Sequence, residues 1–131
     1  MTEPRATKHL EMLQDAIARM AGYSFLAKGW SVTVATAILG LAVKDGGPQF
    51  LWVSGLAVVL FWLIDAYYLG LERGFRALFD AAVQSPIETF DMTPKTDGGA
   101  TLVAASRPSV LMVHPPLLVA FLLADYFLRK A

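Results

Sequence analysis

Nineteen consecutive residues, from Gly46 to Ile64, carry no charged side chain. In an α-helix, which rises ~1.5 Å per residue, such a run covers ~28 Å, close to the ~30 Å hydrocarbon core of a bilayer. The run ends at Asp65 and is followed by an amphipathic segment that contains Glu72, Arg76 and Asp80. The sequence therefore predicts a membrane protein in which one transmembrane helix continues into water.

The composition agrees with this prediction. Of the 131 residues, 56% are hydrophobic and 17% are charged, whereas a soluble domain usually carries ~25% charged residues. The net charge is zero and the basic residues do not form runs, so nucleic acid is not an expected partner. Cysteine is absent, which excludes disulfides and every Cys-based metal site. The expected partner is the lipid bilayer.

Two apolar spans are separated by a short breaker and should form a helical hairpin. The first span covers residues 29–43 and begins after Lys28. Because it is short for a full crossing, a re-entrant or core helix stays an alternative. The second span covers residues 48–71, and its helix is expected to extend into the cytoplasm to about residue 84. Residues 45–48, with two glycines and a proline, provide the turn.

A third membrane segment is expected at residues 109–128. Two prolines at 115–116 lie near its start, so its regular helix should begin there. Residues 85–108 form a cytoplasmic excursion, in which residues 87–92 and 100–105 could pair as a small β-hairpin. A lone two-stranded ribbon is only marginally stable unless it packs on the helices or on a neighbouring chain.

An amphipathic helix over residues 7–28 is expected to run directly into the first span. Its apolar and small residues recur at steps of three and four, and the register continues across the boundary at Leu10, Leu13, Ile17, Met20, Ser24, Ala27, Ser31, Val34, Ile38 and Leu41. This seam could pack against the second helix or against another subunit. The whole chain, residues 1–131, is thus predicted to be a single all-α membrane domain, with the small β-hairpin as the one exception.

The distribution of Lys and Arg predicts the orientation. With three spans, eight of these residues fall on one side, and three on the other, namely Lys44, Arg129 and Lys130. Cytoplasmic loops carry the excess of positive charge, so the N-terminus should be cytoplasmic.

Asp65 is the first candidate for a functional role. It lies on an aromatic-rich apolar helix, and an acid in that position needs a partner or water. One hypothesis makes it a pore-lining or coupling carboxylate. The alternative is an interfacial acid held by Lys28, by a tyrosine hydroxyl or by a helix end. Lys28 itself is expected to snorkel to the membrane interface.

The hairpin geometry predicts ion pairs between the two long helices. If the turn is centred near Gly46, residues whose numbers sum to about 92 lie at one height. This places Arg19 opposite Glu72 and Asp15 opposite Arg76. Exposed pairs of this kind contribute only ~0–1 kcal/mol each, so they would set the register rather than hold the fold together.

No residue cluster indicates catalysis, a cofactor or a metal. His9 lies on a polar helix and His114 precedes two prolines near an interface, so each is expected to be a solvated or capping imidazole. Gly98 and Gly99 follow Asp97 as a turn, without a helix start that could hold phosphate. We therefore expect a protein that is not an enzyme and that binds no cofactor or metal.

The strings HLEMLQDAIARMAGYSFLAKGW and WLIDAYYLGLERGFRALFD resemble those of a family of small bacterial membrane proteins. In that family an N-terminal helix enters a KGW-type boundary, and a DAYYL, ER, FR and LFD series follows the second span. Such proteins resemble those encoded in antiphage defence neighbourhoods, beside nucleotide-signalling or TIR-type partners. The resemblance covers residues 9–30 and 62–80, about a third of the chain.

The resemblance implies a homo-oligomeric effector in the bacterial inner membrane, whose assembly or opening permeabilises that membrane. A chain this small cannot enclose a pore alone. Two alternatives stay open: a membrane anchor or scaffold that recruits a soluble partner, and a small transporter.

Overall fold

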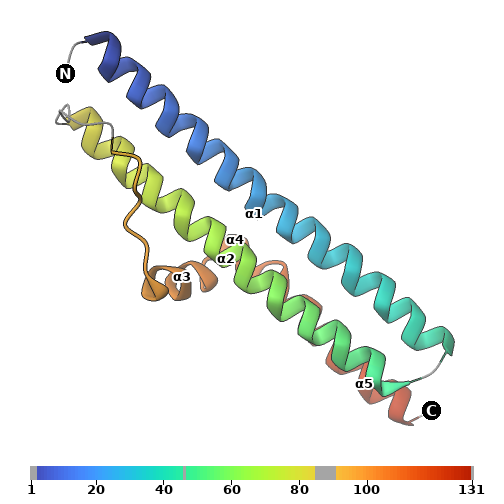
Figure 1. The fold of residues 1–131 in the computed structure, drawn as a ribbon. Helices are drawn as coiled ribbons and strands as arrows, with labels where there is room; N and C mark the ends of the chain where they lie inside the picture. Colours follow the sequence, from blue (N-terminus) through green and yellow to red (C-terminus); the bar gives the residue numbers. More distant parts are fainter. Residues whose placement is uncertain (1–2, 46, 85–90, 131) are drawn as a thin grey trace.

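The structure is a computed structural model that describes residues 3–45, 47–84 and 91–130. Two long helices dominate it, α1 (Glu3–Asp45, 43 residues) and α2 (Pro48–Gln84, 37 residues). They pack side by side and antiparallel, as Figure 1 shows. The predicted hairpin is therefore present. The amphipathic segment and the first span are one uninterrupted helix, as expected.

Three shorter helices complete the chain. They are α3 (Gly98–Ala105), α4 (Pro108–Leu111) and α5 (His114–Lys130). α5 lies along the half of the hairpin that contains its turn, and the C-terminal end of α5 is at the same end as that turn (Figure 1). Pro115 and Pro116 occupy its first turn, where a missing N–H costs no intrahelical hydrogen bond.

The hairpin is held together by small residues. Buried positions on α1 include Leu13, Ser24, Ala27, Ser31, Ala35 and Ala42. They recur about every 3.6 residues, the period of a straight α-helix, rather than every 3.5 as in a coiled coil. The predicted seam therefore coincides with the buried face at Leu13, Ser24, Ala27 and Ser31, but its last residue, Leu41, is exposed. Small side chains on this face let the two helices approach closely.

The apolar core lies between α1, α2 and α5. Its fully or nearly buried residues are Ala35, Ala42, Leu51, Val58 and Phe121. In the following, "apolar half" denotes residues 29–43 of α1, 48–64 of α2 and 114–124 of α5. "Arm" denotes residues 3–28 of α1 and 65–84 of α2, which continue beyond it.

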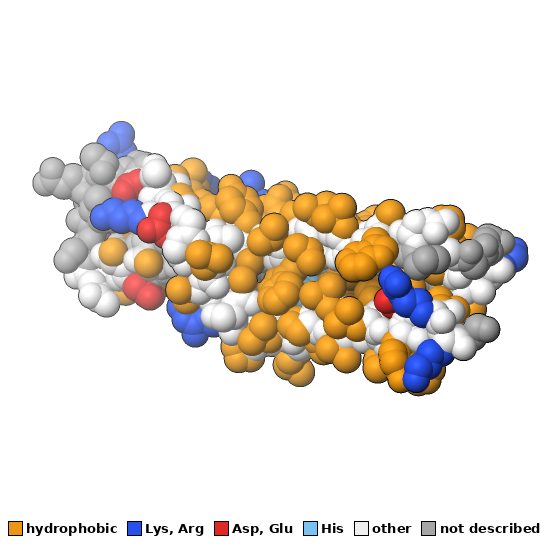
Figure 2. Space-filling view, turned by 90° about the horizontal axis from the view of Figure 1, so that it is seen from below, with side chains coloured by type: hydrophobic (Ala, Val, Ile, Leu, Met, Phe, Trp, Pro, Cys, Tyr) orange, Lys and Arg blue, Asp and Glu red, His pale blue; other side chains and the backbone are white. Residues whose placement is uncertain are grey.

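Three helices in the described part of the chain are long and apolar enough to cross a membrane. At ~1.5 Å per residue, α1 is ~65 Å and α2 ~55 Å long, about twice the thickness of a hydrocarbon core. If either long helix crosses a bilayer, part of that helix must therefore extend beyond the hydrocarbon core. Figure 2 shows the corresponding surface: hydrophobic side chains cover the middle, and charged side chains gather towards both ends.

The predicted β-hairpin is wrong. Residues 100–105 are helical, because Asp97 caps the start of α3 by accepting a hydrogen bond from the backbone N–H of Ala100 at 2.7 Å. The expected partner strand, residues 87–92, lies mostly outside the described residues. Asp97, Gly98 and Gly99 thus begin a helix, where the sequence had indicated only a turn.

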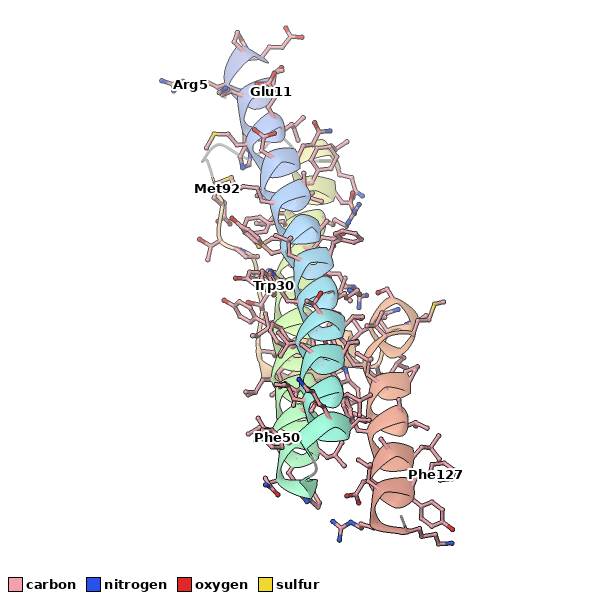
Figure 3. All side chains as sticks on the ribbon, turned by 90° about the vertical axis from the view of Figure 1, so that its right-hand side faces the viewer. Arg5, Glu11, Trp30, Phe50, Met92 and Phe127 are labelled. Carbon is pink, nitrogen blue, oxygen red and sulfur yellow. The ribbon has the colours of Figure 1, made fainter. Side chains whose placement is uncertain are left out.

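An extended strap, residues 91–97, connects the arm to α3. It passes α2 at Gly74, where a Cβ atom would lie 2.8 Å from Cβ of Pro94. At its start, Nε2 of His9 on α1 is 2.9 Å from the carbonyl oxygen of Asp91. Figure 3 shows Met92 of this strap beside the arm. The absence of a side chain at Gly74 is what allows the strap to lie this close.

Candidate functional site: a buried polar centre

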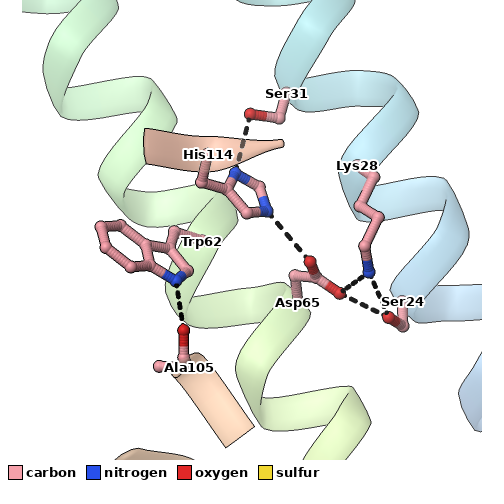
Figure 4. Close-up of polar contacts among 7 residues, drawn as sticks. All are labelled: Ser24, Lys28, Ser31, Trp62, Asp65, Ala105 and His114. Carbon is pink, nitrogen blue, oxygen red and sulfur yellow. Dashed lines mark hydrogen bonds and ion pairs between the residues drawn. The ribbon is translucent and has the colours of Figure 1, made fainter. Parts of the chain in front are cut away.

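Five polar side chains from three helices meet at the junction between the apolar half and the arm (Figure 4). We call them the buried polar centre: Ser24, Lys28 and Ser31 from α1, Asp65 from α2, and His114 from the first turn of α5. Asp65 lies nineteen residues after Gly46, or ~28 Å along the helix. The centre is therefore about one hydrocarbon thickness away from the turn.

Asp65 is the hub of the centre. One carboxylate oxygen, Oδ1, accepts a hydrogen bond from Nζ of Lys28 at 2.6 Å and another from the Ser24 hydroxyl. The other oxygen, Oδ2, is 3.0 Å from Nε2 of His114. The Asp65 side chain is fully buried, and that of Lys28 is only 18% exposed. A buried carboxylate with three donors, one of them a cation, meets the condition under which a buried charge is tolerated.

The contacts of His114 determine its tautomer. A carboxylate oxygen only accepts, so Nε2 carries the hydrogen that points to Asp65. Nδ1 then accepts from the hydroxyl of Ser31, 3.3 Å away. The ring also stacks on Trp62, with centroids 6.2 Å apart and planes 9° from parallel.

Trp62 links the centre to α3. Its indole N–H donates to the carbonyl oxygen of Ala105 at 3.1 Å, while its ring lies against His114. The chain between α3 and α5 contains α4. It is held before α4 by the hydrogen bond of Trp62 to Ala105, and after α4 by the hydrogen bond of His114 to Asp65.

The centre is chemically closed. Among the described residues, every buried side-chain nitrogen and oxygen has a hydrogen-bond partner. The same residues include no group of three or more His, Asp and Glu that could hold a metal ion. The arrangement joins α1, α2 and α5 at one point.

Asp65 has one of the partners that the sequence suggested for it. The pairing with Lys28 is present, and the carboxylate faces the inside of a single chain. Nζ of Lys28 donates hydrogen bonds to Ser24 and Asp65. The expectation for the two histidines is wrong, because His114 is fully buried in the centre and His9 is buried against the strap.

One sequence signal could have located His114. It is the single ionisable residue between Arg107 and Asp125, and Asp65 interrupts the second apolar span in the same way. Ionisable residues within membrane segments pair with one another. A lone acid and a lone base in neighbouring spans are thus natural partners.

The contacts between the long helices agree with the predicted register. The residue numbers of Lys28 and Asp65 sum to 93, and those of Tyr23 and Tyr68, whose ring centroids are 5.1 Å apart, sum to 91. The four charged residues that were predicted to pair between the two helices of the arm behave differently. Among the described residues, neither Arg19 nor Asp15 forms an ion pair with α2, and Arg76 instead binds Glu72 of its own helix at 2.8 Å.

A comparison of the chain with family models, with curated proteins and with solved structures finds no match.

Proposed function

We propose that this chain is one subunit of a homo-oligomer in the bacterial inner membrane, with its N-terminus in the cytoplasm, and that the assembled subunits form a pore. The observation that carries the proposal is the outer face of α1. Four residues on it, Gly29, Thr33, Thr36 and Gly40, are exposed in the single chain and lie in the apolar half. We call them the outer stripe.

The outer stripe is diametrically opposite the face that packs on α2. At 100° per residue, Gly29, Thr33, Thr36 and Gly40 fall within about 60° of one another, and Ser31, Ala35 and Ala42 lie half a turn away. Cβ atoms added at Gly29 or Gly40 would meet nothing within 4 Å. Small residues spaced in this way are typical of interfaces between membrane helices, because they allow backbones to approach. A second copy of the chain would supply the missing partner.

The outer stripe also has suitable chemistry for a pore wall. Of the described residues in the apolar half, Thr33 and Thr36 are the ones that present a hydroxyl outward, since Ser31 and Ser54 are buried. The Thr33 hydroxyl donates to the carbonyl of Gly29 at 2.9 Å, so its oxygen can still accept from water. A ring of α1 helices would thus line a narrow passage with hydroxyls and glycines. Polar residues in membrane segments face the interior of a bundle or a water-filled cavity.

The cellular role that we propose is that of an effector in antiphage defence, which the resemblance of residues 9–30 and 62–80 implies. On the proposed topology, the arm extends ~28–38 Å into the cytoplasm. It would be the part that meets a nucleotide-signalling or TIR-type partner.

The test is ion flux from liposomes together with oligomer size in detergent. Gly29→Leu combined with Gly40→Leu should reduce both, because the added side chains hold neighbouring α1 helices apart. Val53→Phe is the matched control, since Val53 is exposed on α2 away from the outer stripe and the substitution adds a similar bulk. Flux that persists in the double variant as in the parent chain would overturn the proposal.

A membrane scaffold is the second candidate, and the arm favours it. The arm carries a groove lined by residues of both helices, among them Gln14, Ala18, Arg76 and Asp80. A scaffold would give an intact oligomer without flux, whereas a pore gives both. The same measurement therefore separates the two functions.

A further inference from the structure

A second groove lies in the apolar half, between α2 and α5. It has a volume of about 440 Å³, and its walls include Leu51, Gly55 and Val59 from α2 and Leu118 and Leu122 from α5. Beneath it, Phe121 and Val58 belong to the core. The groove is on the surface that meets lipid once the three helices are in a bilayer.

The length of the groove matches one leaflet. From Leu51 to Val59, α2 rises ~12 Å, and half of a hydrocarbon core is ~15 Å. The groove begins at the end of the helices where the hairpin turn lies, because Leu51 is three residues after the start of α2. Figure 3 shows Phe50 and Phe127 at this same end of the molecule. A flexible apolar chain that enters from the headgroup level would fit along it.

The two ends of the groove differ in charge. Along its length the walls are apolar, but Asp125 and Trp52 line it at the end near the turn. Nε of Arg129 is 2.9 Å from both carboxylate oxygens of Asp125, which neutralises that acid. Lys130 follows in the last turn of α5, with its ammonium 4.4 Å from the centre of the Tyr126 ring. Arg129 and Lys130 follow the last lining residue, Asp125, so the described end of α5 beside the groove carries two cations and one acid.

We propose that this groove binds one acyl chain of an anionic phospholipid, with the phosphate held by Arg129 and Lys130. The apolar walls receive the chain over the depth of one leaflet, and the cations receive the headgroup. Gly55 creates the space, because a Cβ there would meet nothing within 4 Å. On the proposed topology, Arg129 and Lys130 lie on the non-cytoplasmic side, where few Lys and Arg are expected. Binding of a lipid phosphate explains why a basic pair occurs there. The proposal does not depend on the oligomer or on the pore.

The experiment is native mass spectrometry of the full chain. The protein is extracted from vesicles with equal amounts of phosphatidylglycerol and phosphatidylethanolamine. We expect retained lipid that is enriched several-fold in phosphatidylglycerol. Gly55→Phe fills the groove and should remove the retained lipid, whereas Leu60→Phe, at an exposed position of α2 outside the groove, should not. Arg129→Gln with Lys130→Gln should keep a bound lipid but abolish the preference.

Three results for the parent chain and for Gly55→Phe would overturn the proposal. The first is equal retention of both lipids by the parent chain. The second is undiminished retention in Gly55→Phe, which would mean that the lipid binds elsewhere. The third is a change of oligomer size in Gly55→Phe without loss of lipid, which would mean that a second copy occupies the groove. Arg129 and Lys130 lie outside the apolar half, so their double substitution is an independent test. An unchanged preference of that variant for phosphatidylglycerol contradicts the proposal even if Gly55→Phe does not fold.

Discussion

Nε2 of His114 lies 3.0 Å from Oδ2 of Asp65, so the first residue of α5 is bonded to the one acid that interrupts the apolar part of α2. Both side chains are fully buried. This contact is a polar connection between α5 and the hairpin, and its partners are separated by 49 residues of sequence. His114 also meets Ser31 of α1 and stacks on Trp62 of α2, and apolar contacts of α5 with the hairpin lie in the core around Phe121.

His114→Ala should loosen α5 from the hairpin. The substitution leaves Oδ2 of Asp65 without a donor in a buried site, and Ser31 loses its acceptor. We expect a loss of ~1–3 kcal/mol in the free energy of unfolding, measured by denaturant titration in detergent micelles. His114→Gln retains an N–H donor and should recover part of the loss. Equal losses for both variants would show that the imidazole acts through packing alone.

Asp65→Asn should destabilise the protein because it leaves the Lys28 ammonium, which is largely buried, without a counter-charge. Removing one partner of a buried pair costs ~3–5 kcal/mol, and less where the lysine can swing outward to an interface. Adding Lys28→Met should restore part of the stability. A double-mutant cycle gives the coupling, for which we expect ~1–3 kcal/mol. As a surface control, Lys8→Gln removes an exposed pair with Glu11 and should change stability by less than ~0.5 kcal/mol. Additive losses at positions 28 and 65 would contradict the paired arrangement.

Gly74→Ala should destabilise the arm, although alanine favours a helix. A Cβ at position 74 would lie 2.8 Å from Cβ of Pro94, and the rigid proline ring cannot turn away. Gly22→Ala is the matched control on α1, where nothing lies within 4 Å, and it should gain ~0.5–1 kcal/mol from helix propensity. Proteolysis within the strap is the local measurement and should speed up only in Gly74→Ala. A gain in stability at both positions would mean that the strap does not rest on Gly74.

The topology can be read from single cysteines, because the native chain contains none. Lys44→Cys and Lys130→Cys should react with an impermeant thiol reagent added to intact cells, whereas Lys95→Cys should react only after the membrane is opened. All three positions are exposed. The expected pattern follows from the excess of Lys and Arg on the side of Lys95. Labelling of Lys95→Cys but not of Lys130→Cys in intact cells would reverse the orientation.

The parts of the fold that follow from local sequence could be predicted. Charge-free runs mark the membrane segments, and the turn between them sets the helix register, so the hairpin and the pairing of Lys28 with Asp65 were both accessible. Alternating steps of three and four average 3.5 residues, whereas the buried face of α1 follows 3.6, so the predicted seam ends on the exposed Leu41.

The missed features depend on contacts between distant residues. His9 meets Asp91 across 82 residues of sequence, and His114 meets Ser31 across 83. No local pattern predicts the partner of His9. The isolation of His114 in an apolar segment predicts an acidic partner such as Asp65, but it does not identify Ser31. The helix at residues 98–105 was missed because its apolar residues suit a strand as well as a helix, and the cap at Asp97 decides between them.

Blocking of the conductance by thiol modification at Thr33 tests the pore most directly. In a planar bilayer, Thr33→Cys should conduct like the parent chain, and a bulky charged thiol reagent should then close it, because the side chain belongs to the wall of the pore. Leu60→Cys, exposed on α2 and facing lipid, should be unaffected by the same reagent. A conductance that survives complete modification of Thr33→Cys, verified by mass spectrometry, would contradict the assignment of the outer stripe of α1 to a pore.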